Sequence, residues 1–143
     1  MKYQLGNYVT ERSKPGQILT VSEIDLKNLC VIDGYVLNEE TAKQARILPI
    51  EKVSPIPLDA EWYKRCNFYR VDHVHGYSFY TFNRKDKANR GLVDLDINEN
   101  STTTGGRTIN HIKYLHQLQN VFYALNGIEL PITHTELTTK KEI

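Results

Sequence analysis

INHIKYLHQLQNVFYALNGIEL, residues 109–130, is the longest stretch of this sequence with a single clear period. Large apolar side chains recur along it at steps of three and four residues, at Ile112, Leu115, Leu118, Phe122 and Leu125. This spacing predicts a helix over 110–126 whose apolar face lies on a hydrophobic core. Asn110 is the expected N-cap, and Gly127 with the later Pro131 predicts where the helix ends.

A strip of uncharged polar and aromatic residues runs beside this apolar face: His116, Gln119, Asn120 and Tyr123. Two interpretations are open. In the favoured one the strip is internal, and its amides form hydrogen bonds with neighbouring loops or strands of the protein. In the other, the strip is a partner surface, because amide and aromatic groups suit specific contacts. The four residues are therefore the candidate binding site.

The rest of the sequence indicates short strands and turns, so the predicted fold class is α+β. Residues 1–57 predict a small SH3-like β-barrel lobe, with turns at Lys14-Pro15-Gly16 and Asp33-Gly34 and a strand at Tyr35–Leu37. The prolines of Ser54-Pro55-Ile56-Pro57 mark a joint. Residues 58–143 predict a second α+β lobe. It contains a short helix capped by Asp59, antiparallel strands within 68–82 and 92–97, a mobile turn at 98–106, a possible short strand at 107–109 and the helix 110–126.

Composition places the chain among soluble globular proteins. It has 143 residues, of which 40% are hydrophobic and 24% charged, with a formal net charge of +1. No apolar run approaches the roughly 20 residues that a membrane span needs, and no secretory signal is evident. Cys30 and Cys66 have no metal-binding spacing, so free thiols are expected.

No catalytic motif stands out, so the sequence predicts a protein that is not an enzyme. His73 and His75 share a strand face but lack supporting ligands, and we expect no metal and no other cofactor. A basic loop follows a group of aromatic residues and is a weak candidate for nucleic-acid binding, through Arg84, Lys85, Lys87 and Arg90. Basic and aromatic groups together suit single strands. The nearly balanced charge argues against binding driven by phosphate neutralisation.

Three segments carry a family resemblance: LGNYV at 5–9, SPIPLDAEWYKRCNF at 54–68, and IKYLHQLQNVFYALNGIEL at 112–130. The sequence resembles a family of small uncharacterised proteins from phages and mobile elements of Gram-negative gut anaerobes, which end in a helix with an HQLQN-aromatic motif. His116 to Asn120 match that motif. Asn67 stands where the family more often has glycine, and residues 83–107 and 131–143 do not match.

The resemblance implies an origin but carries over no activity. From the sequence as a whole we expect a phage- or element-encoded accessory protein that binds another macromolecule, with a phage or host protein as the first expectation. Its expected location is the cytoplasm of the bacterial host, or the virion. The alternatives are a nucleic-acid-binding module and a virion structural or cargo protein.

Overall fold

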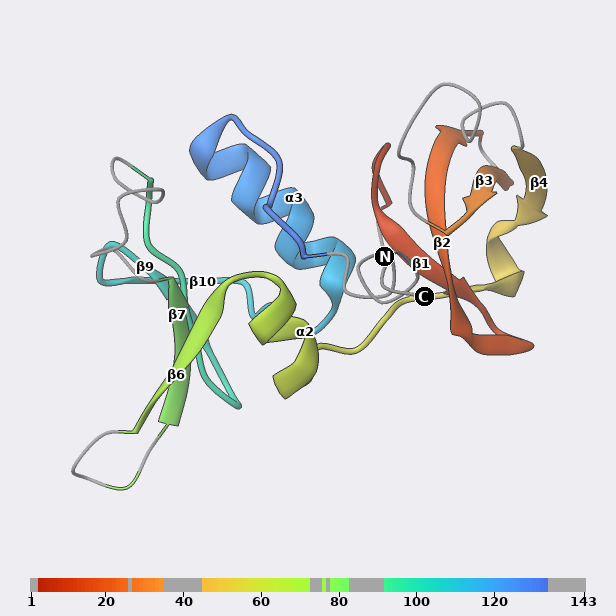
Figure 1. Ribbon diagram of the computed structural model, residues 1–143. Helices are drawn as coiled ribbons and strands as arrows, with labels where there is room; N and C mark the ends of the chain where they lie inside the picture. The colour runs from red at the N-terminus through yellow and green to blue at the C-terminus, as the bar shows by residue number, and fades with distance from the viewer. Residues whose placement is uncertain are drawn as a thin grey trace. The chain divides into compact units, whose positions relative to one another are not determined.

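The structure is a computed structural model that describes residues 3–25, 27–34, 45–72, 76, 78–82 and 92–133 (Figure 1). Its elements are, in chain order, β1 (Tyr8–Glu11), β2 (Lys14–Ile24), β3 (Asn28–Asp33), β4 (Arg46–Pro49), the 3₁₀ helix η1 (Ile50–Lys52), β5 (Val53–Ser54), α2 (Ala60–Arg65), β6 (Phe68–Asp72), β7 (Ser78–Phe82), β8 (Asp96–Ile97), β9 (Thr102–Thr104), β10 (Arg107–Ile109) and α3 (Leu115–Asn126). Antiparallel sheets and helices together confirm the α+β class. None of the described helices is long and apolar enough to cross a membrane.

The chain divides into two compact units. The first comprises Met1–Pro57 and Tyr114–Asn120, and the second comprises Leu58–Lys113 and Val121–Ile143. The boundary after Pro57 falls at the proline-rich joint. The sequence placed the whole C-terminal helix in the second lobe, whereas the first half of α3 belongs to the first unit.

The first unit contains a five-stranded antiparallel sheet in the order β4-β3-β2-β1-β5. The predicted turn at Lys14-Pro15-Gly16 is wrong, because these residues begin β2 and the turn lies at Arg12–Ser13. Thr10 pairs with Ile18, and Glu11 pairs with Lys14, so the register shifts between these two pairs. Residues 15–17 have no partner on β1 at this irregularity. Pro15 can therefore begin the strand, because its missing N–H would form no hydrogen bond with β1.

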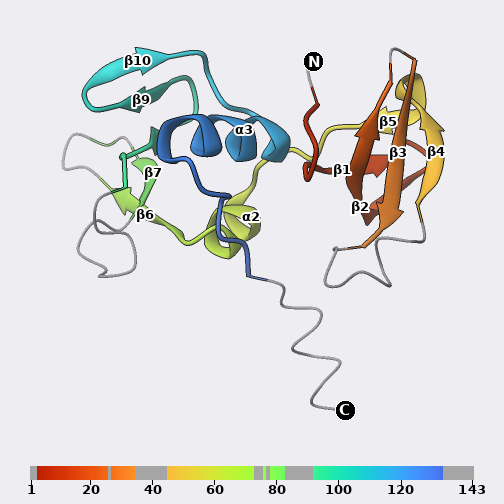
Figure 2. The ribbon, with the colours of Figure 1, turned by 90° about the horizontal axis from the view of Figure 1, so that it is seen from above.

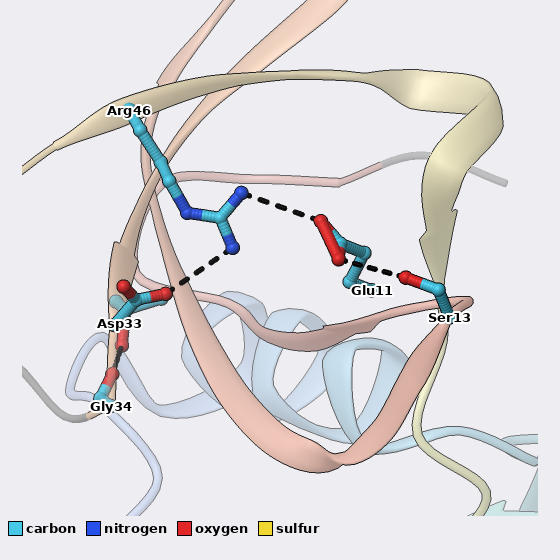
Figure 3. Close-up of polar contacts among 6 residues, drawn as sticks. Glu11, Ser13, Asp33, Gly34 and Arg46 are labelled. Atoms are coloured by element: carbon cyan, nitrogen blue, oxygen red, sulfur yellow. Dashed lines mark hydrogen bonds and ion pairs between the residues drawn. The ribbon is translucent and has the colours of Figure 1, made fainter.

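The hydrophobic core of the first unit takes side chains from all five strands: Val9, Leu19, Val21, Leu29, Val31, Leu48 and Val53, each at most 3% exposed. On β4, Arg46 donates to Glu11 of β1 at 3.4 Å and to Asp33 of β3 at 3.3 Å (Figure 3). Because β3 and β2 separate β4 from β1 in the sheet, the first ion pair requires the sheet to curl. The curl lets the strands cover one another's apolar faces.

The second unit contains a five-stranded antiparallel sheet in the order β10-β9-β8-β7-β6. Instead of a mobile turn over 98–106, the structure has β9 there, paired with both β8 and β10 (Figure 2). The short strand predicted at 107–109 is confirmed as β10. Gly105 and Gly106 join β9 to β10 with φ of 56° and 79°, a conformation that suits a two-residue hairpin. The polar run of threonines lacks apolar alternation, which is why its strand character was missed, although threonine favours strands.

The short helix α2 begins as the sequence predicts. The Asp59 carboxylate accepts a hydrogen bond from the Trp62 N–H at 2.9 Å, which satisfies one free donor of the first turn. Asn67 follows the helix with a φ of 65°, the left-handed conformation that ends helices and that asparagine tolerates better than most residues.

Helix α3 begins at Leu115 and not at 110. The Gln117 side chain accepts a hydrogen bond from the Tyr114 N–H at 3.1 Å, as in one half of a capping box. Ile112 lies before the start of the helix, and its N–H donates to the Thr102 hydroxyl at 3.0 Å. Ile112 is therefore buried, as predicted, but it is not part of the helix. The predicted end is confirmed, since Gly127 has a φ of 70° and its N–H donates to the Tyr123 carbonyl at 2.8 Å.

Candidate functional site

Two members of the predicted strip on α3 are tied into the first unit. The Gln119 amide accepts from the Tyr8 N–H at 2.8 Å and donates to the Gly6 carbonyl at 3.3 Å. The Asn120 side chain accepts from the Asn7 amide at 2.7 Å. These bonds join the first half of α3 to the turn before β1, as the internal interpretation expects.

A third member, His116, is completely buried. Its ring lies against Tyr3, with ring centroids 4.7 Å apart, and against Tyr114 at 6.1 Å. Neither ring nitrogen has a hydrogen-bond partner in the part of the chain that the structure describes. Burial lowers the pKa of His116 to about 4, because removing the imidazolium from water is unfavourable. His116 is therefore a neutral packing residue at physiological pH.

Replacing Asn120 with alanine is expected to lower the free energy of unfolding by about 1–3 kcal/mol, because the nearly buried Asn7 amide loses its acceptor. Tyr123→Ala on the same helix is the matched control, and it should change stability by no more than about 0.5 kcal/mol. Chemical denaturation of both variants measures the difference. Equal midpoints for Asn120→Ala and the wild type would show that the amide contact is not formed in solution.

The fourth member, Tyr123, is 54% exposed. It belongs to a group of exposed large apolar side chains in the second unit, which we name the α3-end patch: Val93, Tyr123, Leu125 and Ile128. The Val93 N–H donates to the Asn126 side chain at 2.6 Å, which holds Val93 at the end of the helix. Leu125 was predicted to lie on the core face, but it is 36% exposed because the buried contact at this end of the helix is made by Phe122.

The second unit also contains a cleft of about 800 Å³. Its sheet side is formed by Arg70, Ser78, Tyr80 and Ile97, and Tyr63 of α2 stands beside them. The lining also includes the turn 98–101 and residues 111–113. The Tyr63 and Tyr80 rings are stacked, with centroids 4.0 Å apart and an interplanar angle of 8°.

Arg70, Asp72 and Ser78 form a closed hydrogen-bonded triangle at one end of the cleft. Arg70 donates through Nε to Asp72 Oδ1 at 2.9 Å and through Nη2 to Ser78 Oγ at 3.1 Å. The Ser78 hydroxyl donates to the same Asp72 oxygen at 2.6 Å. The hydrogen bonds from Ser78 and Arg70 lower the pKa of Asp72, so its carboxylate stays ionised.

His111 also lines the cleft, and contacts at both ring nitrogens hold its side chain in place. Its Nδ1 lies 3.0 Å from the hydroxyl of the fully buried Thr102, and its Nε2 lies 3.2 Å from the Glu99 carbonyl. The carbonyl can only accept, so Nε2 carries the proton. In the neutral ring Nδ1 is then an acceptor, so the Thr102 hydroxyl, which accepts from the Ile112 N–H, donates its own proton to Nδ1. Both ring nitrogens are thus used in holding the turn in place.

Sequence reasoning missed the cleft. The register of the β6–β7 hairpin could have indicated it. In this hairpin Phe68 pairs with Phe82, Arg70 with Tyr80 and Asp72 with Ser78. All six side chains fall on one face of the sheet, apolar at one end and polar at the other. The predicted basic loop (Arg84, Lys85, Lys87 and Arg90) and the histidines His73 and His75 lie outside the described residues, as does the predicted strand Tyr35–Leu37.

Comparison with known proteins gives no relative: no family model, no curated protein and no solved structure matches this chain.

Proposed function

We propose that this chain is a non-catalytic binding protein that recognises another protein through the α3-end patch. The observation that carries the proposal is the exposure of Val93, Tyr123, Leu125 and Ile128, which lie at 39%, 54%, 36% and 49%. Exposed large apolar side chains can serve as contacts with another protein, and the bond from the Val93 N–H to Asn126 places Val93 near this end of α3. Tyrosine contributes strongly at such sites, because its ring buries a large area and its hydroxyl still forms a hydrogen bond.

The state of the nucleophilic side chains supports a role without catalysis. Cys66 is buried, and burial raises the pKa of its thiol to about 12, so almost no reactive thiolate exists near neutral pH. Burial likewise raises the pKa of Tyr63 to about 12. Both groups serve as packing residues of the second unit.

The biological setting of the proposal rests on sequence resemblance. A protein carried by a phage or mobile element, acting in the bacterial host or as part of the virion, would meet phage or host proteins as partners. The sequence also suggests two alternatives, a nucleic-acid-binding module and a virion structural or cargo protein.

Tyr123→Ala and Ile128→Ser are expected to abolish recovery of a partner protein when the tagged full chain is used to capture proteins from host lysate. The matched control is Tyr69→Ala, which removes a 44% exposed tyrosine from β6 outside the patch and should leave recovery unchanged. Circular dichroism checks that all three variants fold. A partner recovered equally by the wild type and both patch variants would contradict the proposal, and so would one lost equally with Tyr69→Ala.

We also propose that the first unit is an SH3-like barrel. Three observations support this: the order β4-β3-β2-β1-β5, the 3₁₀ helix η1 between β4 and β5, and the core drawn from all five strands. The pairing of Arg46 with Glu11 across the sheet adds to them. Methyl NOEs between Leu48 on β4 and Val9 on β1 are expected in a closed barrel, and an open sheet would lack them.

A further inference from the structure

The helices α2 and α3 pack on the apolar end of the face of the β6–β7 hairpin. Phe82 stacks on Phe122 of α3 with ring centroids 5.1 Å apart, and Phe68 packs against Tyr63 of α2 at 5.9 Å. The next pair along the hairpin is Arg70 and Tyr80, and beyond it lie Asp72 and Ser78. At these two pairs the side chains become polar and the cleft opens.

The polar end of the cleft presents the guanidinium of Arg70, which is bonded to Asp72 beside the cleft. The Arg70 guanidinium uses Nε and Nη2 within the triangle, and its Nη1 forms no hydrogen bond among the described residues. Asp72 accepts both internal bonds on Oδ1, and its Oδ2 likewise has no partner among them. The internal bonds orient the guanidinium of Arg70, so its spare Nη1 donor is positioned before a ligand arrives.

Among the described residues at the cleft, the formal charges balance. Arg70 and Lys113 are positive, while Glu99 and Asp72, the latter bonded to two cleft residues, are negative. A site for a phosphate or another strong anion would carry an excess of positive charge. The balance favours an uncharged ligand that both donates and accepts hydrogen bonds.

Beside Arg70, the lining of the cleft is aromatic and apolar. The stacked Tyr63 and Tyr80 rings line it together with the apolar Leu58 and Ile97. Ligand sites commonly combine such an apolar lining with a few fixed polar groups that set the ligand's orientation. A ligand that suits this cleft therefore has one apolar face and one edge rich in hydrogen-bonding groups.

From this geometry we propose that the cleft binds a neutral carbohydrate residue. A sugar ring has C–H faces that pack on aromatic side chains, and adjacent hydroxyl groups that each donate one hydrogen bond and accept others. The spare Nη1 of Arg70 donates to a sugar hydroxyl, while Tyr63 and Tyr80 line the sugar ring. This site goes beyond the protein-binding proposal and uses none of the α3-end patch.

The test is a titration of the ¹⁵N-labelled full chain with glucose, galactose, mannose, N-acetylglucosamine, maltose, cellobiose and lactose. We expect saturable shifts of the Ser78, Tyr80 and 98–101 amides with at least one of these sugars, with a Kd on the order of 1 mM, which corresponds to about 4 kcal/mol of binding free energy. Sodium phosphate at the same concentration should not compete. Absence of saturable shifts with every sugar would overturn the proposal, and so would displacement of the sugar by phosphate.

Two variants of Arg70 separate hydrogen bonding from charge. Arg70→Met removes the donors and should weaken sugar binding at least about tenfold, and Arg70→Lys, which keeps the charge but loses the planar fork, should weaken it similarly. Arg107→Met is the matched control, an exposed arginine on β10 that does not line the cleft, and it should bind as the wild type does. Wild-type affinity in Arg70→Lys or Arg70→Met would overturn the proposal. The α3-end variant Tyr123→Ala should bind sugar normally, so failure of either proposal is visible separately.

Discussion

Phe122→Ala is expected to lower the free energy of unfolding by about 3–5 kcal/mol. Phe122 is fully buried on α3, and its ring stacks on Phe82 at 5.1 Å between centroids. Truncation removes the apolar area that the ring buries and leaves a cavity that the β7 side of the core cannot fill without moving. Denaturant midpoints of the purified variant and the wild type measure the loss.

The matched control for this prediction is Leu125→Ala, one turn further along the same helix and 36% exposed. It also removes a large apolar side chain from α3, but most of the loss in Phe122→Ala comes from burial and cavity formation. The control should therefore cost far less. If the two variants lose the same stability, the burial of Phe122 against Phe82 does not hold in solution.

Acidification is expected to destabilise the first unit through His116, by up to about 3 kcal/mol. The ordinary pKa of histidine is 6.5, and burial lowers that of His116 to about 4 in the folded protein. The unfolded chain then takes up a proton more readily than the folded chain below pH 6.5. The stabilising contribution of the neutral imidazole is full above about pH 6.5, falls as the pH drops toward 4, and changes little below 4.

The measurement is the melting temperature of the wild type and of His116→Leu at intervals between pH 7.5 and pH 4. The leucine variant cannot take up the proton, so its melting temperature should fall less over this range. Tyr123→Ala is the control, because it changes an exposed residue on the same helix and leaves every histidine in place, so it should keep the wild-type pH dependence. Parallel pH profiles for His116→Leu and the wild type would remove His116 as the cause.

The sequence correctly predicted helix ends that depend on residues close by in the chain. Asp59 caps α2 and Gly127 ends α3 because each acts on backbone groups within a few residues of itself. The start of α3 was misplaced for the opposite reason. Ile112 has helical spacing, but its N–H is taken by Thr102, a partner ten residues earlier on a strand with no apolar alternation.

The candidate sites depend on pairings that no local pattern contains. The amides of Gln119 and Asn120 were recognised as polar groups needing partners, but the partners lie before β1. The cleft follows from the pairing of Arg70 with Tyr80 together with the position of α2 over Phe68. A hairpin register can be read from the sequence, whereas the end at which a helix covers the sheet is decided by tertiary packing.

The contact between α3 and the turn before β1 also bears on how the protein is made. Asn7 and Asn120 are 113 residues apart in the chain, and Tyr8 and Gln119 are 111 apart. During synthesis the five strands of the first unit leave the ribosome long before residues 114–120 exist, at a rate of roughly 5–20 residues per second. For several seconds the nascent sheet must therefore persist with the Asn7 amide and the Tyr8 N–H still hydrogen-bonded to water, and the unit becomes complete only when the C-terminal helix emerges.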